Sequence, residues 1–211
     1  MATAKKKTDE PIQIQAIEPI TIKVTVQALE GKSDLHTHRF GETALKGLRD
    51  STMKKPRQGK KAKRDPDQEY KESLYVFGKD TIGVPAIMFK KAMTNACRLT
   101  DLPMTHAKQM IFVLGTDPDE PEFCEVYNTA PQIHEAIVPA GNGKGATLSY
   151  RACFPGDWRI DVGLQFIPNV ISTEQVLNLL NLAGFSVGIG CQRPERGGQY
   201  GRFSIVANGT A

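Results

Sequence analysis

The distribution of apolar residues predicts strands at both ends of the chain, with helices and further strands between them. Residues 20–29 alternate between apolar and polar side chains, as a half-buried strand requires; the apolar positions are Ile20, Ile22, Val24, Val26 and Ala28. Runs of β-branched and aromatic residues predict further strands at 110–114, 123–127, 133–138, 147–154, 159–167, 185–189 and 202–206. Helical spacing of apolar residues predicts helices at 42–52, 67–77, 86–99 and 173–183. Helices packed on one antiparallel sheet are typical of the α+β class.

The helix predicted at 173–183 has clear signals at both ends. Ser172 can cap its N-terminus, and Gln175 lies at the third helical position, as in a capping box. Gly184 follows where a left-handed C-terminal cap is favoured. We therefore expect this helix to end at Ala183 and a strand to follow it.

The helix predicted at 86–99 begins after Pro85, which is favoured in the first helical turn. Its polar face carries Lys91, Asn95 and Arg98 at positions i, i+4 and i+7. A row with this spacing can follow a phosphate backbone, although a solvated helix face has the same pattern.

Length and composition describe a soluble globular protein. A chain of 211 residues with 40% hydrophobic and 24% charged residues suits one domain, and no apolar run approaches the length of a membrane span. Lys5, Lys6 and Lys7 have no hydrophobic stretch behind them, so we expect no secretory signal and a cytoplasmic location. We divide the chain into a basic N-terminal tail, residues 1–18, and a single domain, residues 19–211.

Positive charge is concentrated in one segment. The formal net charge of +4 is modest, but an insertion at about 53–66 is dense in cations and contains no acid between Lys54 and Arg64. Its cations are Lys54, Lys55, Arg57, Lys60, Lys61, Lys63 and Arg64. Pro56 and Gly59 interrupt any helix there, so we expect a flexible basic finger that a polyanion orders. A solvated loop is the alternative.

A second basic segment combines arginine with glycine. Between 190 and 202 the chain alternates these residue types, namely Gly190, Arg193, Arg196, Gly197, Gly198, Gly201 and Arg202. Glycine exposes backbone N–H groups, and guanidinium groups bind phosphate oxygens in pairs, so the segment is a candidate phosphate site. A glycine-rich turn with solvated arginines is the alternative. Tyr200 and Phe40 are candidate base-stacking residues.

Evidence for catalysis or for a cofactor is weaker. His36 and His38 would share one face of an extended segment and can in principle act as acid and base or bind a metal, but no third ligand is evident beside them. The four cysteines, Cys97, Cys124, Cys153 and Cys191, contain no C-x-x-C pair and are expected to be reduced core thiols. Glycine-rich segments match neither a P-loop nor a dinucleotide fingerprint. We expect no cofactor and no metal.

Several of these segments together resemble the RAMP superfamily, the RNA-binding proteins that form the backbone of CRISPR effector complexes. Residues 82–92 (IGVPAIMFKKA) are similar to that superfamily's helix start, and the last helix with 188–190 and 198–203 is similar to its glycine-rich loop. The basic insertion lies where that superfamily has a thumb. The chain also looks like uncharacterised phage-encoded proteins that share an H-R-F segment, here His38, Arg39 and Phe40.

The resemblance implies a ferredoxin-like core with helices on one face of an antiparallel sheet. It implies a non-catalytic protein that binds single-stranded RNA or DNA and assembles along the strand as a homo-oligomer or filament. An endoribonuclease that uses His36 or His38, and a phage structural protein that binds no nucleic acid, are the alternatives. The expected nucleic-acid contacts are Lys54, Lys55, Arg57, Lys60, Lys61, Lys63, Arg64, Lys91, Arg98, Arg193, Arg196, Gly198, Tyr200, Arg202, His36, His38, Arg39 and Phe40.

Overall fold

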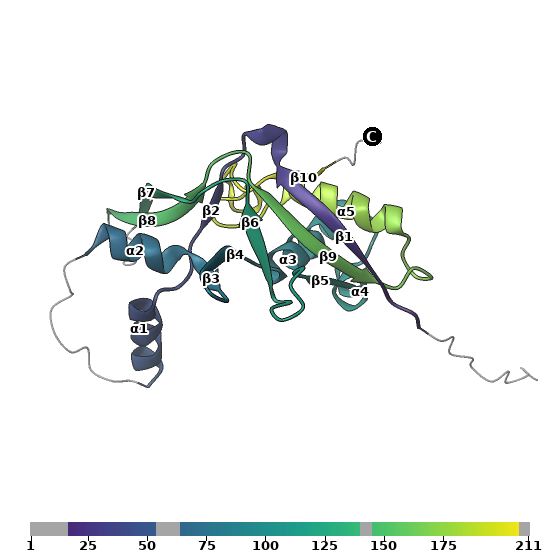
Figure 1. The fold of residues 1–211 in the computed structure, drawn as a ribbon, viewed down its shortest axis with the longest axis horizontal. Coiled ribbons are helices and arrows are strands. Elements are labelled where there is room, and N and C mark those ends of the chain that lie inside the picture. Colours follow the sequence, from purple (N-terminus) through teal and green to yellow (C-terminus); the bar gives the residue numbers. More distant parts are fainter. Residues whose placement is uncertain (1–16, 54–63, 140–144, 207–211) are drawn as a thin grey trace, which may run out of the picture.

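The computed structural model describes residues 17–53, 64–139 and 145–206 (Figure 1). The predicted N-terminal tail up to residue 16 and six cations of the basic finger lie outside the described residues; these cations are Lys54, Lys55, Arg57, Lys60, Lys61 and Lys63. The helices are α1 (Glu42–Thr52), α2 (Pro66–Ser73), α3 (Ile87–Ala96), α4 (Met104–Met110) and α5 (Thr173–Ser186), with single 3-10 turns at Leu29–Gly31, Cys97–Leu99 and Pro194–Arg196. Among the described residues no helix has both the length and the apolar character needed to cross a bilayer.

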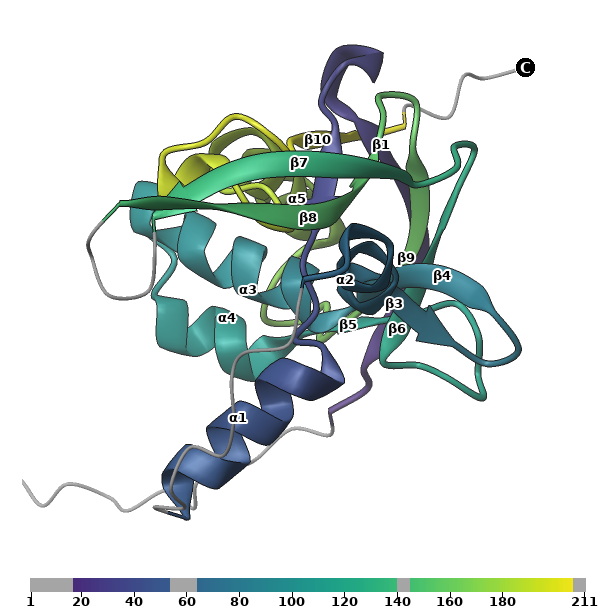
Figure 2. The ribbon, with the colours of Figure 1, turned by 90° about the vertical axis from the view of Figure 1, so that its left-hand side faces the viewer.

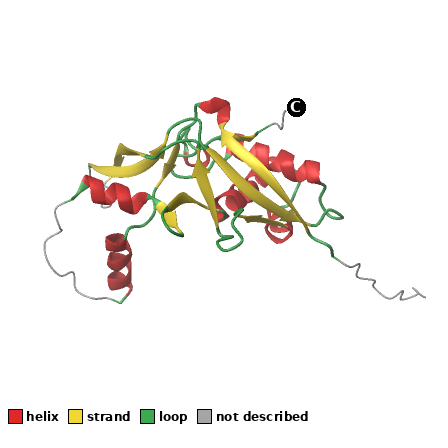
Figure 3. Cartoon of the chain, viewed as in Figure 1, coloured by secondary structure: helices red, strands yellow, loops and turns green. Residues whose placement is uncertain are grey.

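The strands form two antiparallel sheets, shown in yellow in Figure 3. They are β1 (Ile20–Ala28), β2 (Leu35–Thr37), β3 (Tyr75–Phe77), β4 (Thr81–Pro85), β5 (Ile111–Leu114), β6 (Phe123–Tyr127), β7 (Gln132–Pro139), β8 (Ala146–Phe154), β9 (Arg159–Phe166) and β10 (Phe203–Ile205). The expected α+β class with antiparallel strand pairing is confirmed, but the strands form two sheets rather than the one expected.

The larger sheet has the order β10-β1-β9-β6-β4-β3, and β5 also pairs with β9. Along β1 the alternation predicted from the sequence is observed, because Val24, Val26 and Ala28 are buried. Helices α3, α4 and α5 lie behind β1 and β9 in Figure 1, on one face of this sheet. The core between them includes Phe89 of α3 and Leu180 of α5, both without exposed surface.

The smaller sheet, β2-β8-β7, crosses the top of the molecule in Figure 2. Strand β2 pairs with only the end of β8, where His36 lies opposite Cys153. Next to β2, the end of helix α2 binds the same edge of β8, because the Ala152 N–H donates to Ser73 Oγ at 2.8 Å. One face of this sheet carries His36, Cys153 and His134, and the glycine-arginine segment lies at its end.

The predicted end of the last helix is wrong. Helix α5 continues through Gly184 to Ser186, and the strand predicted at 185–189 is absent from the described structure. Gly188, with φ at 70°, ends the helix, and its N–H donates to Ala183 O at 2.9 Å. Gly184 serves a different purpose: a Cβ there would lie 2.1 Å from Phe203 O, so glycine permits α5 to approach β10.

Two other predicted boundaries also require correction. The helix predicted at 67–77 ends at Ser73, because Tyr75–Phe77 forms β3 and pairs with β4. Pro85 is the last residue of β4, so α3 begins two residues later, at Ile87. The prediction of a helix at 42–52 is confirmed residue for residue as α1, and none of its described side chains is fully buried.

Candidate nucleic-acid interface

The glycine loop, residues 188–202, is attached to the edge of β2 that faces away from β8. The Gly201 N–H donates to Asp34 O at 2.7 Å, and the Cys191 N–H donates to His36 O at 2.8 Å. The two acceptors, Asp34 just before β2 and His36 within it, are two residues apart, as in the ladder of a sheet. The loop therefore acts as an irregular fourth member of the β2-β8-β7 sheet.

Glycine is required in this loop mainly for packing. Gly190 has a φ of 76°, and a Cβ there would lie 2.3 Å from His36 O. At Gly198 and Gly201 a Cβ would lie 1.7 Å from Gln192 O and 1.9 Å from Ile189 O. The Gly198 N–H donates to Arg193 O at 3.1 Å, so it is already paired within the loop. The loop thus offers phosphates fewer free N–H groups than the sequence indicates, and its side chains become the main contacts.

Three rings lie next to one another near the end of this loop. Tyr200 stacks on His36 with ring centroids 4.2 Å apart and an interplanar angle of 22°. The other neighbour of His36 is His134 of β7, with centroids 4.3 Å apart. His36 is only 1% exposed, whereas Tyr200 is 37% exposed. A rigid aromatic surface is therefore presented to solvent, with a buried imidazole supporting it from below.

The imidazole of His36 is held in the neutral form. Burial, the largest cause, lowers its pKa, and the nearby His134 and Arg151 act in the same direction; the hydrogen bond with Gln192 opposes them. His36 Nδ1 lies 2.8 Å from Gln192 Oε1. A neutral ring stacks on Tyr200 without introducing an uncompensated charge into the buried layer.

His38 does not share this environment, although the sequence places the two histidines on one face. It lies just beyond the end of β2 and is exposed, and its ring meets the edge of the Phe40 ring at a centroid distance of 6.4 Å. Arg39 and Phe40 are exposed beside it, and Phe40 is available for stacking. The two histidines therefore belong to separate places, one buried under Tyr200 and one on an exposed turn.

The three loop arginines differ in their freedom to bind a ligand. Arg193 is committed to the loop, because it forms an ion pair with Glu195 at 2.5 Å and donates from Nη1 to Gly190 O at 2.9 Å. The Arg202 guanidinium lies over the Phe185 ring, 4.6 Å from its centroid. Arg196 is exposed and makes no ion pair within the described part of the chain. Arg196 is thus the loop arginine most available to a phosphate.

Helix α3 brings the predicted basic row next to this loop. Asn95 Nδ2 donates to Glu195 Oε1 at 2.6 Å, which joins the polar face of α3 to the 3-10 turn of the loop. Lys91 and Arg98 are exposed on either side of Asn95. The two basic features predicted separately therefore lie next to each other.

A hollow of about 420 Å³ extends this surface between α3 and α4. Two lysines that the sequence did not single out line it with Lys91, namely Lys90 and Lys108. The Lys90 ammonium group lies 4.0 Å from the centroid of the Phe112 ring, a cation–π contact with β5. Three ammonium groups around one hollow give it a positive potential.

Arg64 is the described cation at the end of the basic finger, and it lies at the far end of β8. It donates to both carboxylate oxygens of Glu69, from Nε at 2.6 Å and from Nη2 at 2.5 Å, and to Thr147 Oγ1 at 2.9 Å. The hydrogen bond with Arg64 lowers the pKa of Glu69. Arg64 is therefore bound to α2 and β8, and its charge is already compensated by Glu69.

Several residues of the interface were missed because tertiary structure alone assembles them. His134 and Gln192 lie far from His36 in the sequence, and only the pairing of β7 with β8 and the path of the loop bring them together. Lys108 belongs to α4, which the sequence did not predict as a separate helix. Charge and exposure were readable from the sequence, but these long-range pairings were not.

Comparison with known proteins gives limited information. No family model matches the chain, and no curated protein matches it. One similar solved structure is a chain of a cryo-EM structure of Type III-B Cmr-beta bound to cognate target RNA, with a TM-score of 0.39 and 10% sequence identity. The match covers 90% of this chain but only 59% of that chain.

Proposed function

We propose that this protein binds single-stranded nucleic acid, RNA or DNA, without cleaving it. The observation that carries the proposal is the exposed ring of Tyr200, which stacks on buried His36 in a loop whose 3-10 turn is hydrogen-bonded to the polar face of α3. Stacking on an aromatic ring suits single strands because their bases are free to leave the strand's own stack. A ring that is already fixed loses little conformational freedom on binding.

Phosphates of the same strand would follow the cations next to Tyr200. Arg196 is exposed on the glycine loop, and Lys91 on α3 and Arg98 in the 3-10 turn after it continue the path. The Asn95–Glu195 hydrogen bond fixes these two parts relative to each other. The cations of the basic finger, which lie outside the described residues apart from Arg64, would add further phosphate contacts.

We further propose a ferredoxin-like core of the RAMP type for this binder. The strand order β10-β1-β9-β5 supports it, with α3 between β1 and β5 in the sequence and α5 between β9 and β10. This is the order of two βαβ halves that share one antiparallel sheet. Copies that assemble side by side would extend the basic surface along the strand, so the number of nucleotides bound per protein would stay constant as the strand lengthens.

Fluorescence anisotropy with labelled single-stranded RNA, single-stranded DNA and duplex, each at several salt concentrations, tests the proposal. We expect tighter binding of one single strand than of duplex, and weaker binding as salt rises. A variant with Lys60, Lys61, Lys63 and Arg64 changed to Ala should bind more weakly. Absence of binding at low salt would overturn the proposal and favour a structural protein.

A second candidate activity is RNA cleavage, favoured by the paired imidazoles of His36 and His134, whose centroids are 4.3 Å apart. Two neighbouring imidazoles can serve as general acid and base, provided that a ligand displaces Tyr200 and reaches His36, which is 1% exposed. Incubation of labelled RNA with the protein tests this activity. Cleavage that stops in both His36→Ala and His134→Ala would support it, and intact RNA after prolonged incubation would exclude it.

A further inference from the structure

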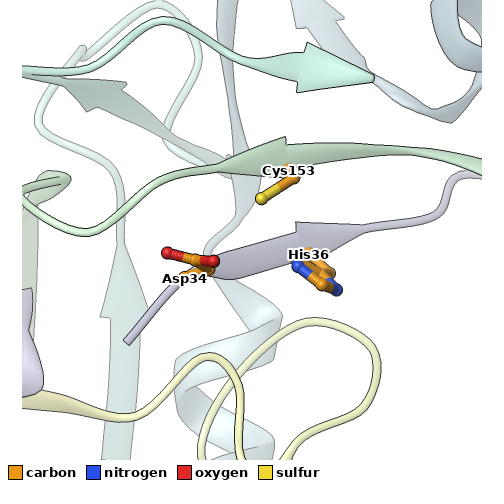
Figure 4. A group of neighbouring side chains, drawn as sticks. All are labelled: Asp34, His36 and Cys153. Carbon is orange, nitrogen blue, oxygen red and sulfur yellow. The ribbon is translucent and has the colours of Figure 1, made fainter. Parts of the chain in front are cut away.

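Three side chains of different chemistry meet where β2 begins. Asp34 and His36 are two residues apart on an extended segment and so lie on one face, and Cys153 of β8 lies directly opposite His36 in the register. One ligand atom from each of the three lies within 4.8 Å of the other two. Figure 4 shows these side chains, with the sulfur of Cys153 directed toward β2.

Cys153 differs from the other three cysteines in this chain. The thiols of Cys97, Cys124 and Cys191 each donate to a backbone oxygen, at 3.3, 3.9 and 3.2 Å respectively. The Cys153 thiol has no hydrogen-bond partner among the described residues, although the residue is only 8% exposed. Buried polar groups normally have a partner, so a thiol that has none and points into a cluster of potential ligands indicates a contact with a ligand.

The other two members of the cluster are already oriented by their surroundings. The Gly156 N–H donates to Asp34 Oδ1 at 2.9 Å, which fixes the carboxylate and leaves Oδ2 facing away from that bond. His36 Nδ1 lies 2.8 Å from Gln192 Oε1. If Nδ1 carries the proton, it donates a hydrogen bond to Gln192 Oε1, and Nε2 is the free ligand atom. If Nε2 carries the proton, Gln192 Oε1 instead supplies an oxygen beside the ligating Nδ1.

We propose that Asp34, His36 and Cys153 form a binding site for a Zn²⁺ ion. A thiolate, an imidazole and a carboxylate are the ligand types that zinc prefers, whereas calcium and magnesium prefer oxygen ligands alone. Tetrahedral zinc with bonds of about 2.0–2.3 Å places its ligand atoms about 3.3–3.8 Å apart. Shifts of about 1 Å would bring three atoms that lie within 4.8 Å of one another into that arrangement.

The ion would join three parts of the chain that are distant in sequence. Its protein ligands come from β2 and β8, and Gln192 adds the glycine loop, which lies against the same edge of β2. The fourth coordination position is left to Gln192 Oε1 or to water. Metal binding would therefore stiffen the support of Tyr200, but it does not depend on whether the protein binds nucleic acid.

Titration of tag-free, chelator-treated and desalted protein with Co²⁺ tests the site directly, because a thiolate ligand gives cobalt a charge-transfer band in the near ultraviolet. We expect one equivalent of Co²⁺ to produce the band and one equivalent of Zn²⁺ to abolish it. The band should be absent in Cys153→Ser. It should persist in Cys124→Ser, a matched control in which a buried cysteine of β6 is replaced. Gln192→Leu should bind about 10- to 100-fold more weakly.

Circular dichroism shows whether Cys153→Ser folds. If it does not fold, a second measurement on the wild-type protein still tests the site. X-ray absorption at the zinc edge of the wild-type protein should show one sulfur among lighter nitrogen and oxygen neighbours. Absence of the cobalt band in the wild type, its persistence in folded Cys153→Ser, or a zinc shell without sulfur would each overturn the proposal. None of these measurements involves nucleic acid, so the zinc site can fail while the proposed binding function stands.

Discussion

At the scale of single residues, Tyr200 makes the sharpest prediction. Changing Tyr200 to Ala removes the stacking surface and should weaken binding of single strands by about 1–3 kcal/mol, which is about 5- to 150-fold in Kd. Tyr200→Phe retains the ring and should bind nearly as well as the wild type. Fluorescence anisotropy measures both. Equal losses in the two variants would mean that the hydroxyl group, rather than the ring face, makes the contact.

Gly184 gives a residue-scale prediction about stability. In an ordinary helix Gly→Ala is favourable, but here the added Cβ would lie 2.1 Å from the backbone oxygen of Phe203. We expect Gly184→Ala to lower the free energy of unfolding by about 1–3 kcal/mol, because α5 must move away from β10. Gly47→Ala in α1 is the matched control, since a Cβ there meets nothing within 4 Å. Urea denaturation of both variants tests this; an unchanged Gly184→Ala would contradict it.

At the scale of elements, local signals predicted starts better than ends. The capping box of Ser172 and Gln175 is present at the start of α5, as its sequence indicates. The end of α5 was misplaced because Gly184 resembles a cap, whereas its lack of a side chain serves contact with β10. Phe185 looked like a strand residue, yet on the helix its exposed ring supports the Arg202 guanidinium. Contacts between segments distant in sequence determine where α5 ends, and such contacts cannot be predicted from a local pattern.

The same distinction applies to the candidate interface. Tyr200, Arg196 and the row of Lys91 and Arg98 were predicted because charge, aromatic character and helical spacing are local properties. Their relation to one another was not predictable, because it depends on the Asn95–Glu195 hydrogen bond between α3 and the loop. The zinc ligands show the limit most clearly: the sequence paired His36 with His38, whereas the fold places it opposite Cys153.

The pairing of β1 with β9 predicts how stability depends on pH. Asp161 of β9 accepts hydrogen bonds at Oδ1 from Thr25 Oγ1 at 2.7 Å and Tyr127 Oη at 2.9 Å, and Oδ2 lies 2.9 Å from Lys23 Nζ. Burial acts to raise the pKa of Asp161, but these hydrogen bonds outweigh it, so its pKa is lowered. A carboxyl with a lower pKa in the folded state stabilises the fold above its unfolded pKa, which is about 3.9 for aspartate. This contribution is lost as the pH falls through the folded-state pKa.

We therefore expect Asp161→Asn to be less stable than the wild type at pH 7, and the difference to shrink as the pH falls below about 4. Urea denaturation at several pH values from neutral to acid measures both effects. Glu125→Gln, at an exposed position of neighbouring β6, is the control and should follow the wild-type profile. A constant difference between Asp161→Asn and the wild type at every pH would show that packing, not ionisation, is responsible.

At the scale of the whole molecule, the arrangement of charge matters more than its sum. The chain carries 27 basic and 23 acidic residues, a small excess that would attract a polyanion only weakly if it were spread evenly. In the described structure several basic groups are neutralised by neighbours, as Arg64 is by Glu69 and Arg193 by Glu195. The exposed cations on α3 and the glycine loop are therefore the ones expected to exchange counterions for phosphates.

The salt dependence of binding tests this distribution. Each phosphate contact with a single strand contributes about 0.7 to the slope of log K against log salt concentration. Changing both Lys91 and Arg98 to Ala should therefore reduce the magnitude of the slope by about 1.4, besides weakening binding at low salt. The control replaces Lys32 and Lys79, exposed lysines in turns outside the interface, and should leave the slope unchanged. If the two double variants changed the slope equally, the strand would respond only to the net charge of the protein. A defined path for the strand instead requires Lys91 and Arg98 in particular.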